Sequence, residues 1–193
     1  PTVSELYQAI TSGPTLVENN PDLAPEKVYS GELTAERRFG NGLLRATLFQ
    51  EEKYDALISQ TITTGVGCIG VTCSFIQNVD RIRTRGVEFA GQWQDVWLHG
   101  LDIMGSLTLT EAEILRNEAA PATVGNKPVR IPSSMAKLVT TYHHGNAWTH
   151  SLAMRYSGRQ YNTLDNSDIN PDTYIAASRF FFVDLRSTYR FAD

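Results

Sequence analysis

The sequence has no long uninterrupted apolar segment. A membrane-spanning helix needs about 20 consecutive apolar residues, whereas the apolar stretches here are only a few residues long, such as Phe180 to Val183. A helical membrane protein is therefore excluded. A protein that crosses a membrane with strands is not, because its lipid-facing residues alternate with inward-facing ones and its average composition is polar.

An excess of positive charge is also lacking. The 17 Lys and Arg residues are outnumbered by 21 Asp and Glu, which gives a formal net charge of −4 and a pI near 5.6. The cations are scattered along the chain rather than gathered in one stripe, as a nucleic-acid-binding surface requires. We therefore expect no nucleic-acid partner.

Cysteine is scarce, and both cysteines lie in one Gly-rich segment, GVGCIGVTCSF. A local disulfide between Cys68 and Cys73 is favoured, which suits an oxidising compartment such as the periplasm or the cell surface. Two reduced thiols are the alternative. A metal site is the weakest interpretation, because the spacing of one Cys pair without further ligands is not typical of one.

No catalytic motif is present. The four histidines, His99, His143, His144 and His150, fall near expected turns, and the adjacent pair His143 and His144 would point to opposite faces of a strand. Neither a nucleophile-elbow motif nor a metal-ligand spacing brings Ser, Asp and His together. We therefore expect no enzyme activity, no cofactor and no metal site.

Apolar and polar residues alternate along most of the chain, which predicts an all-β protein. In the clearest segment, 183–191, Leu185 and Phe191 fall on one face while Arg186 and Arg190 fall on the other. Seven strands are expected, at 27–39, 43–58, 82–93, 101–110, 135–142, 148–157 and 183–191. The alternation predicts a lipid-facing surface that contains Leu101, Leu107, Leu152 and Leu185.

Connections of two lengths alternate between these strands. Short turns are expected at 40–42, 94–95 and 144–146, and long connections at 1–26, 59–79, 113–134 and 161–178. Aromatic residues accompany the short turns: Phe39, Trp93, Trp97, Tyr142, Trp148 and Phe191. Such rings either form a membrane-interface girdle or pack a core at the strand ends. The pattern predicts an antiparallel transmembrane β-barrel segment with short periplasmic turns and long extracellular loops.

Five segments carry a family resemblance. They are PTVSELYQ (1–8), NPDLAPEK (20–27), NVDRIRTRGVEFAGQW (78–93), VRIPSSMAKL (129–138) and SLAMRYSGRQY (151–161). In this order they resemble landmarks of the TonB-dependent outer-membrane receptors, siderophore-receptor type. Each motif alone is weak, but together they span nearly the whole chain.

The resemblance implies that residues 1–193 are a partial barrel domain from the C-terminal part of a barrel of about 22 strands, without its plug domain, its TonB box and its final strands. It implies uptake of a ferric siderophore or a similar scarce ligand across the outer membrane of a Gram-negative bacterium. The partners would be the TonB complex, reached through the plug, and outer-membrane lipid. The alternatives are a passive porin-like or enzyme-bearing barrel, and a soluble β-sandwich binding module.

Two groups of residues are candidates for ligand binding. The first group would face the barrel lumen and offer cations to an anionic chelate: Arg45, Arg155, Arg186 and Arg190. The alternative is that these arginines pair with wall carboxylates, such as Glu32, Glu36, Glu88 and Asp184. The second group lies in the connection YNTLDNSDINPDTY (161–174): Tyr161, Asp165, Asp168 and Tyr174. The alternative there is a solvated loop, since Asn, Asp and Pro are ordinary turn residues.

Overall fold

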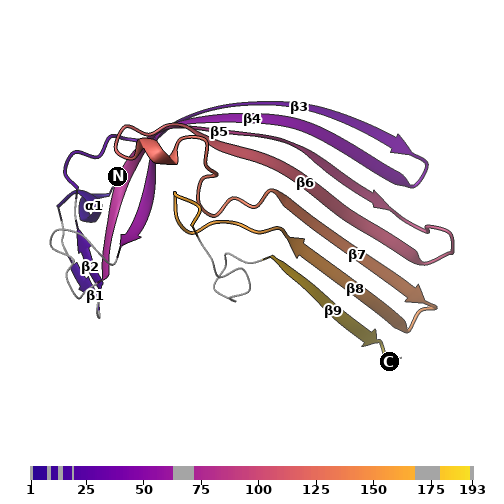
Figure 1. Cartoon of the computed structure of the whole chain (residues 1–193). Coiled ribbons are helices and arrows are strands. Elements are labelled where there is room, and N and C mark those ends of the chain that lie inside the picture. Colours follow the sequence, from indigo (N-terminus) through magenta and orange to yellow (C-terminus); the bar gives the residue numbers. More distant parts are fainter. Residues whose placement is uncertain are drawn as a thin grey trace.

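Seven long strands follow one another as an antiparallel meander in the computed structural model, which describes residues 2–7, 10–12, 15–18, 20–62, 72–167 and 179–191. They are β3 (Lys27–Phe39), β4 (Gly42–Ile62), β5 (Thr72–Trp93), β6 (Leu101–Arg116), β7 (Ser134–His144), β8 (Trp148–Ser157) and β9 (Phe180–Tyr189). The sheet is curved, and its outer strands β3 and β9 lie at opposite edges (Figure 1). The predicted all-β meander is confirmed.

Four smaller elements complete the described chain: α1 (Val3–Tyr7), β1 (Ile10–Ser12), β2 (Thr15–Glu18) and the 3₁₀ helix η1 (Pro121–Thr123). β1 and β2 form a hairpin, and β2 runs parallel to the first residues of β5. This hairpin lies at the end of the sheet remote from the short turns (Figure 1). No helix in the described part is long and apolar enough to cross a membrane.

The strand register sorts the side chains onto two faces. One face, here called the apolar face, carries aliphatic pairs such as Leu48 opposite Val87 and Leu152 opposite Leu185. It includes all four leucines predicted to share a surface, and much of it is exposed, Leu185 by 80%. The other face, here called the polar face, carries Arg45, Thr47, Glu88, Ser106, Lys137, Thr141, Ser151, Arg155 and Arg186.

Aromatic rings gather on the apolar face beside the short turns. Trp148 packs on Tyr189, with ring centroids 4.8 Å apart, and Tyr189 contacts Phe191 edge to face at 4.9 Å. The β3–β4 turn is the short one that the sequence predicts, with Gly40 at a φ of +53°. The β5–β6 connection is longer than predicted. It runs through 94–100, and the Gly100 N–H donates to the Asp95 carboxylate at 2.6 Å.

The prediction of a loop over 59–79 is wrong for its two ends. β4 continues to Ile62 and β5 begins at Thr72, and they pair from Leu57 opposite Asn78 to Ile62 opposite Cys73. The Asn78 side-chain amide donates to the Asp55 carbonyl at 2.7 Å, which holds the ladder together where it is interrupted. Because the Thr- and Ile-rich segments on both sides favour extended backbone, the two strands pair well beyond the predicted ends.

The buried core lies on the polar face at this far end of the sheet. It comprises Ala56, Ile58, Val79, Ile82, Ile114 and Leu164, with Val129 packed against it. By strict alternation Ala56 and Ile82 would fall on opposite faces. Asp55 breaks the alternation, because its φ of +54° places one left-handed residue inside β4. The core therefore joins residues that a period of two separates.

Candidate functional site

Two connections fold together over the polar face. The first, residues 117–133, joins β6 to β7, and the second, residues 158–167, follows β8. We call the two connections together the loop shelf. Asn166 joins them, because its side chain accepts a hydrogen bond from the Lys127 N–H at 2.9 Å and donates one to the Lys127 carbonyl at 2.8 Å. The Arg130 N–H donates to the Tyr161 carbonyl at 2.8 Å. Leu164, 2% exposed, anchors the shelf in the core.

Local sequence explains why these connections are ordered. Asn117 is buried; its amide donates to Thr123 Oγ1 at 2.8 Å, and its carbonyl accepts the Ala120 N–H at 3.2 Å. Asn166 adopts a φ of +55°, a conformation that Asn tolerates better than most residues. Side chains of the shelf therefore hydrogen-bond to groups within the shelf, as buried polar groups in folded proteins do.

A cavity of about 460 Å³ lies at the shelf, between it and strands β4 and β5. Its apolar lining includes Ile58, Ile82 and Val129, and its charged lining is Glu5, Glu26, Glu51, Lys53 and Arg130. Lys53 pairs with Glu26 at 3.5 Å. Within the described part, neither Glu51 nor Arg130 makes an ion pair. A cavity with apolar walls and a few convergent polar groups is the usual form of a small-molecule site.

Two of the predicted loop residues lie in the shelf, and both are engaged there. The Asp165 carboxylate accepts hydrogen bonds from the Ser167 N–H at 3.1 Å and the Ser167 hydroxyl at 2.8 Å. Hydrogen bonds from the Thr163 side chain and then from Ser167 lower the pKa of Asp165 below its ordinary value of 3.8. The Tyr161 ring lies 4.9 Å from the Arg159 guanidinium carbon. Asp168 and Tyr174 lie outside the described residues.

A row of cations crosses the polar face nearer the short turns. The register aligns Glu36, Arg45, Ala90, Ser106, Lys137, Arg155 and Phe182. We call this the cationic row. Small residues in its middle leave a groove of about 400 Å³ between Arg45 and Lys137.

Two of the cations in this row are already paired. Arg45 Nη2 lies 2.9 Å from a Glu36 oxygen, and Arg155 Nη2 lies 3.7 Å from an Asp184 oxygen. Lys137 makes no ion pair with any described residue, although it lies directly opposite Arg155. Two like charges opposite each other destabilise a sheet unless an anion lies between them. Sequence reading missed Lys137, although its alternation with Ala136 and Leu138 places it on the polar face.

The four predicted arginines do not form one cluster. Arg45, Arg155 and Arg186 lie on the polar face of β4, β8 and β9, and Arg190 follows β9, where its N–H donates to the Ala147 carbonyl. For Arg45 and Arg155 the alternative of pairing with wall carboxylates is what the structure shows. Arg186 makes no ion pair in the described part of the chain.

The described residues contain no group of three or more His, Cys, Asp or Glu that could hold a metal ion. Cys73 lies in β5, whereas Cys68 lies outside the described residues, so the Cys68–Cys73 disulfide stays a prediction. The prediction that His143 and His144 point to opposite faces is confirmed. His143 faces Thr149 on the polar side at 3.3 Å, and His144 contacts Tyr142 on the apolar side.

The family model described as TonB dependent receptor-like, beta-barrel matches residues 1–193. No curated protein matches the sequence significantly. Similar solved structures include the ferric preacinetobactin receptor of Acinetobacter baumannii, 18% identical, with 86% of this chain and 23% of that chain covered and a TM-score of 0.61. A copper transporter is 17% identical, with 100% and 27% covered and a TM-score of 0.68. A ferric citrate transporter in its unliganded form is 22% identical, with 88% and 24% covered and a TM-score of 0.65.

At these identities the solved structures establish the fold alone. The chain spans about a quarter of the length of each of these relatives. The matched family model describes receptors, in agreement with the expectation that this is not an enzyme. The β-sandwich alternative is wrong, because the described strands form one sheet and the matched family is a barrel family. With a family model that covers the entire chain and an antiparallel meander of the expected kind, this chain belongs to the TonB-dependent receptor β-barrel family.

Proposed function

We propose that this chain is part of the wall of an outer-membrane receptor that imports a ferric siderophore with energy from the TonB complex. In this arrangement the apolar face contacts lipid and the polar face lines the lumen. The short turns lie on the periplasmic side, and the loop shelf lies near the cell surface. The plug domain, which would connect the receptor to TonB, belongs to another part of the same protein.

The observation that carries this proposal is the placement of the shelf. Both of its connections fold over the polar face, where a ligand would enter, and they leave a cavity of about 460 Å³ beside β4 and β5. Connections on the lipid side of the barrel would not fold over the polar face. Several similar solved structures are receptors for iron complexes, among them those for ferric preacinetobactin and ferric citrate, and this favours a ferric chelate as the ligand. The copper transporter in the same fold indicates that the fold itself does not select the metal.

The cations that make no ion pair with any described residue are the best candidates for ligand contacts along the wall. We place Lys137 and Arg186 first, because neither makes an ion pair with a described residue, whereas Arg45 and Arg155 each engage part of their N–H donors in ion pairs with Glu36 and Asp184. An anionic chelate that passes Lys137 would neutralise a charge that no described residue of the wall pairs. Arg190 at the turn end and Tyr161 and Asp165 in the shelf remain proposed contacts of the same path. Asp168 and Tyr174, which lie outside the described residues, remain proposed ligand contacts as well.

Uptake by the full-length receptor tests the proposal. Radioactive iron would be supplied as its citrate and as its enterobactin complex to cells that lack other iron receptors, with and without the TonB complex. We expect uptake of at least one complex that requires TonB, and a several-fold loss in the double variant K137Q/R186Q. R37Q is the matched control, because Arg37 lies on the apolar face of β3.

Three outcomes would contradict the proposal. Uptake that persists without TonB would indicate the passive porin-like alternative. Equal uptake by K137Q/R186Q and R37Q would show that Lys137 and Arg186 do not contact the transported ligand. If the full reading frame encodes no plug domain and no TonB box upstream of this segment, the proposed TonB-dependent transport would be refuted.

A further inference from the structure

Three arginines form a column on the apolar face of β5. Arg81, Arg83 and Arg85 alternate along the strand and continue the line of Val87 and Phe89. Each arginine pairs with one carboxylate on a neighbouring strand. The distances are 2.6 Å from Arg81 to Glu52, 3.0 Å from Arg83 to Glu113 and 2.9 Å from Arg85 to Glu111. We call these six residues the charged ladder.

The ladder begins where the apolar surface ends. On β5 the apolar face runs from Trp93 to Val87, and Arg85 comes next. A strand crosses the hydrocarbon core in about 9 to 11 residues. Counted from Trp93, which lies beside the short turns, this span ends at about Arg85 to Arg83. The arginine column therefore begins at the boundary of the hydrocarbon layer on the side of the long loops. From there it extends away from the hydrocarbon layer.

The ladder leaves donors available. A guanidinium has five N–H donors. Each arginine of the column uses only one or two of them in hydrogen bonds to its carboxylate. The three side chains are 30% to 50% exposed. The forked guanidinium geometry suits phosphate oxygens, which accept two parallel hydrogen bonds.

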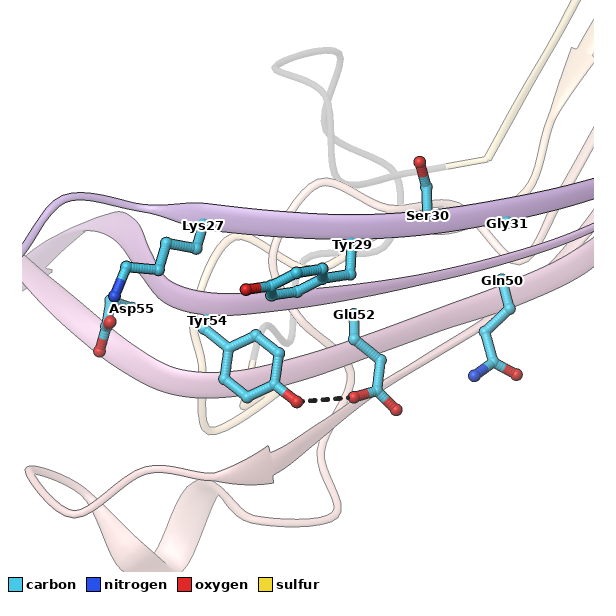
Figure 2. Close-up of a pocket in the computed structure, with 8 residues that line it drawn as sticks. All are labelled: Lys27, Tyr29, Ser30, Gly31, Gln50, Glu52, Tyr54 and Asp55. Carbon is cyan, nitrogen blue, oxygen red and sulfur yellow. Dashed lines mark hydrogen bonds between the residues drawn. The ribbon is translucent and has the colours of Figure 1, made fainter.

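A shallow groove beside the column adds an aromatic surface. It has a volume of about 760 Å³, and its lining residues Lys27, Tyr29, Glu52 and Tyr54 are drawn in Figure 2. The two tyrosine rings meet edge to face at 5.8 Å, and the Arg81 guanidinium carbon lies 5.5 Å from the centre of the Tyr54 ring. Tyrosine rings favour the headgroup level of a membrane. The groove therefore lies at the depth of the lipid headgroups.

This surface is apolar on one side of the boundary. On the other side it carries three arginines, each beside one carboxylate and each using only part of its N–H donors on it. An amphiphile with acyl chains and an anionic headgroup complements both parts. We propose that Arg81, Arg83 and Arg85 bind the phosphate groups of an outer-leaflet lipid whose acyl chains lie along the apolar face. This rests on the proposed contact of that face with lipid, but not on the identity of the transported ligand or on TonB.

Two triple variants of the full-length receptor separate phosphate binding from plain ion pairing. R81Q/R83Q/R85Q removes the donors, whereas E52Q/E111Q/E113Q breaks the same three ion pairs and leaves the donors in place. The probes are lipid A that carries its phosphates and the same lipid after phosphate removal, and co-purified lipid is counted by native mass spectrometry. We expect the arginine variant to retain phosphorylated lipid at least about tenfold less than wild type.

The glutamate variant should retain as much phosphorylated lipid as wild type, or more, because its arginines are freed. The lipid without phosphate should be retained equally by all three proteins. Equal losses in both triple variants would show that the ladder only joins strands, and unchanged retention in the arginine variant would also overturn the proposal. The single variant R83Q keeps the test valid if a triple variant fails to fold. Iron uptake, measured separately, reports on the proposed transport and not on this site.

Discussion

Truncation of Leu164 tests whether the loop shelf is held by its buried anchor. Leu164 is 2% exposed and packs with Ile82 and Ile114 on the polar face. Removing a buried leucine side chain to alanine costs about 2 to 5 kcal/mol, depending on how far the site collapses. Leu164 lies outside the strand ladder, so we expect L164A to weaken the docking of the shelf by about 3 kcal/mol and to leave the sheet intact.

Hydrogen exchange measures this docking directly. The amides of Lys127 and Arg130 donate to Asn166 and Tyr161 across the two connections, so they are protected only while the shelf is closed. A loss of about 3 kcal/mol corresponds to about a hundredfold faster exchange, because each 1.4 kcal/mol is a factor of ten. Peptides that span 124–131 and 158–167 would be followed in the full-length receptor in lipid nanodiscs.

L185A is the matched control, because Leu185 is 80% exposed on the apolar face and does not belong to the buried core that contains Leu164. It should leave exchange in both peptides unchanged. Unchanged exchange in L164A would refute the anchor, and equal acceleration in β4 would show that the residue stabilises the sheet rather than the shelf.

Three further predictions concern the faces, the close packing and the acid range. Spin labels at Leu152 should be accessible to oxygen in the bilayer, and labels at the neighbouring Ser151 to a water-soluble relaxant, because alternation places them on opposite faces. G86A should lower stability by about 1 to 3 kcal/mol in thermal unfolding, because an added Cβ would lie 2.2 Å from the Leu109 carbonyl oxygen. The lowered pKa of Asp165 stabilises the shelf above the ordinary carboxyl range, and this stability is lost as the pH falls through the lowered value. Exchange in the 158–167 peptide should therefore lose its acid sensitivity in D165N, after correction for intrinsic rates.

Each of these predictions has an outcome that contradicts it. Water accessibility at Leu152 would overturn the assignment of the apolar face to lipid. G31A is the control for G86A, since a Cβ at Gly31 meets nothing within 4 Å, and equal stability losses in both variants would refute the packing argument. An acid response in D165N equal to that of wild type would place the titrating group elsewhere.

The sequence alone was enough to predict the strands and their two faces. A period of two is visible wherever one face is uniformly apolar, as it is from Leu101 to Leu109, and tight turns have recognisable residues such as Gly40 and Asn41. The positions of Arg45 and Arg186 on the polar face followed from the same alternation. The family followed from motifs spread along the chain, each of which describes local backbone.

The ends of β4 and β5 and the loop shelf could not be predicted in this way. One left-handed residue, Asp55, reverses the alternation beyond it, and no local pattern announces that reversal. The contacts of Asn166 with Lys127 and of Leu164 with Ile114 join segments far apart in the chain. Such pairs form only when the sheet brings their strands together.

Local alternation therefore determined which side chains share a face, because side-chain direction in a strand depends only on neighbouring residues. Only the tertiary structure decided which charges meet. Register between strands pairs Arg45 with Glu36 and leaves Lys137 opposite Arg155, and it turns the alternating arginines at 81, 83 and 85 into a ladder at the edge of the apolar face. Register is a property of two strands at once, so the charges that a ligand or a lipid would meet depend on it.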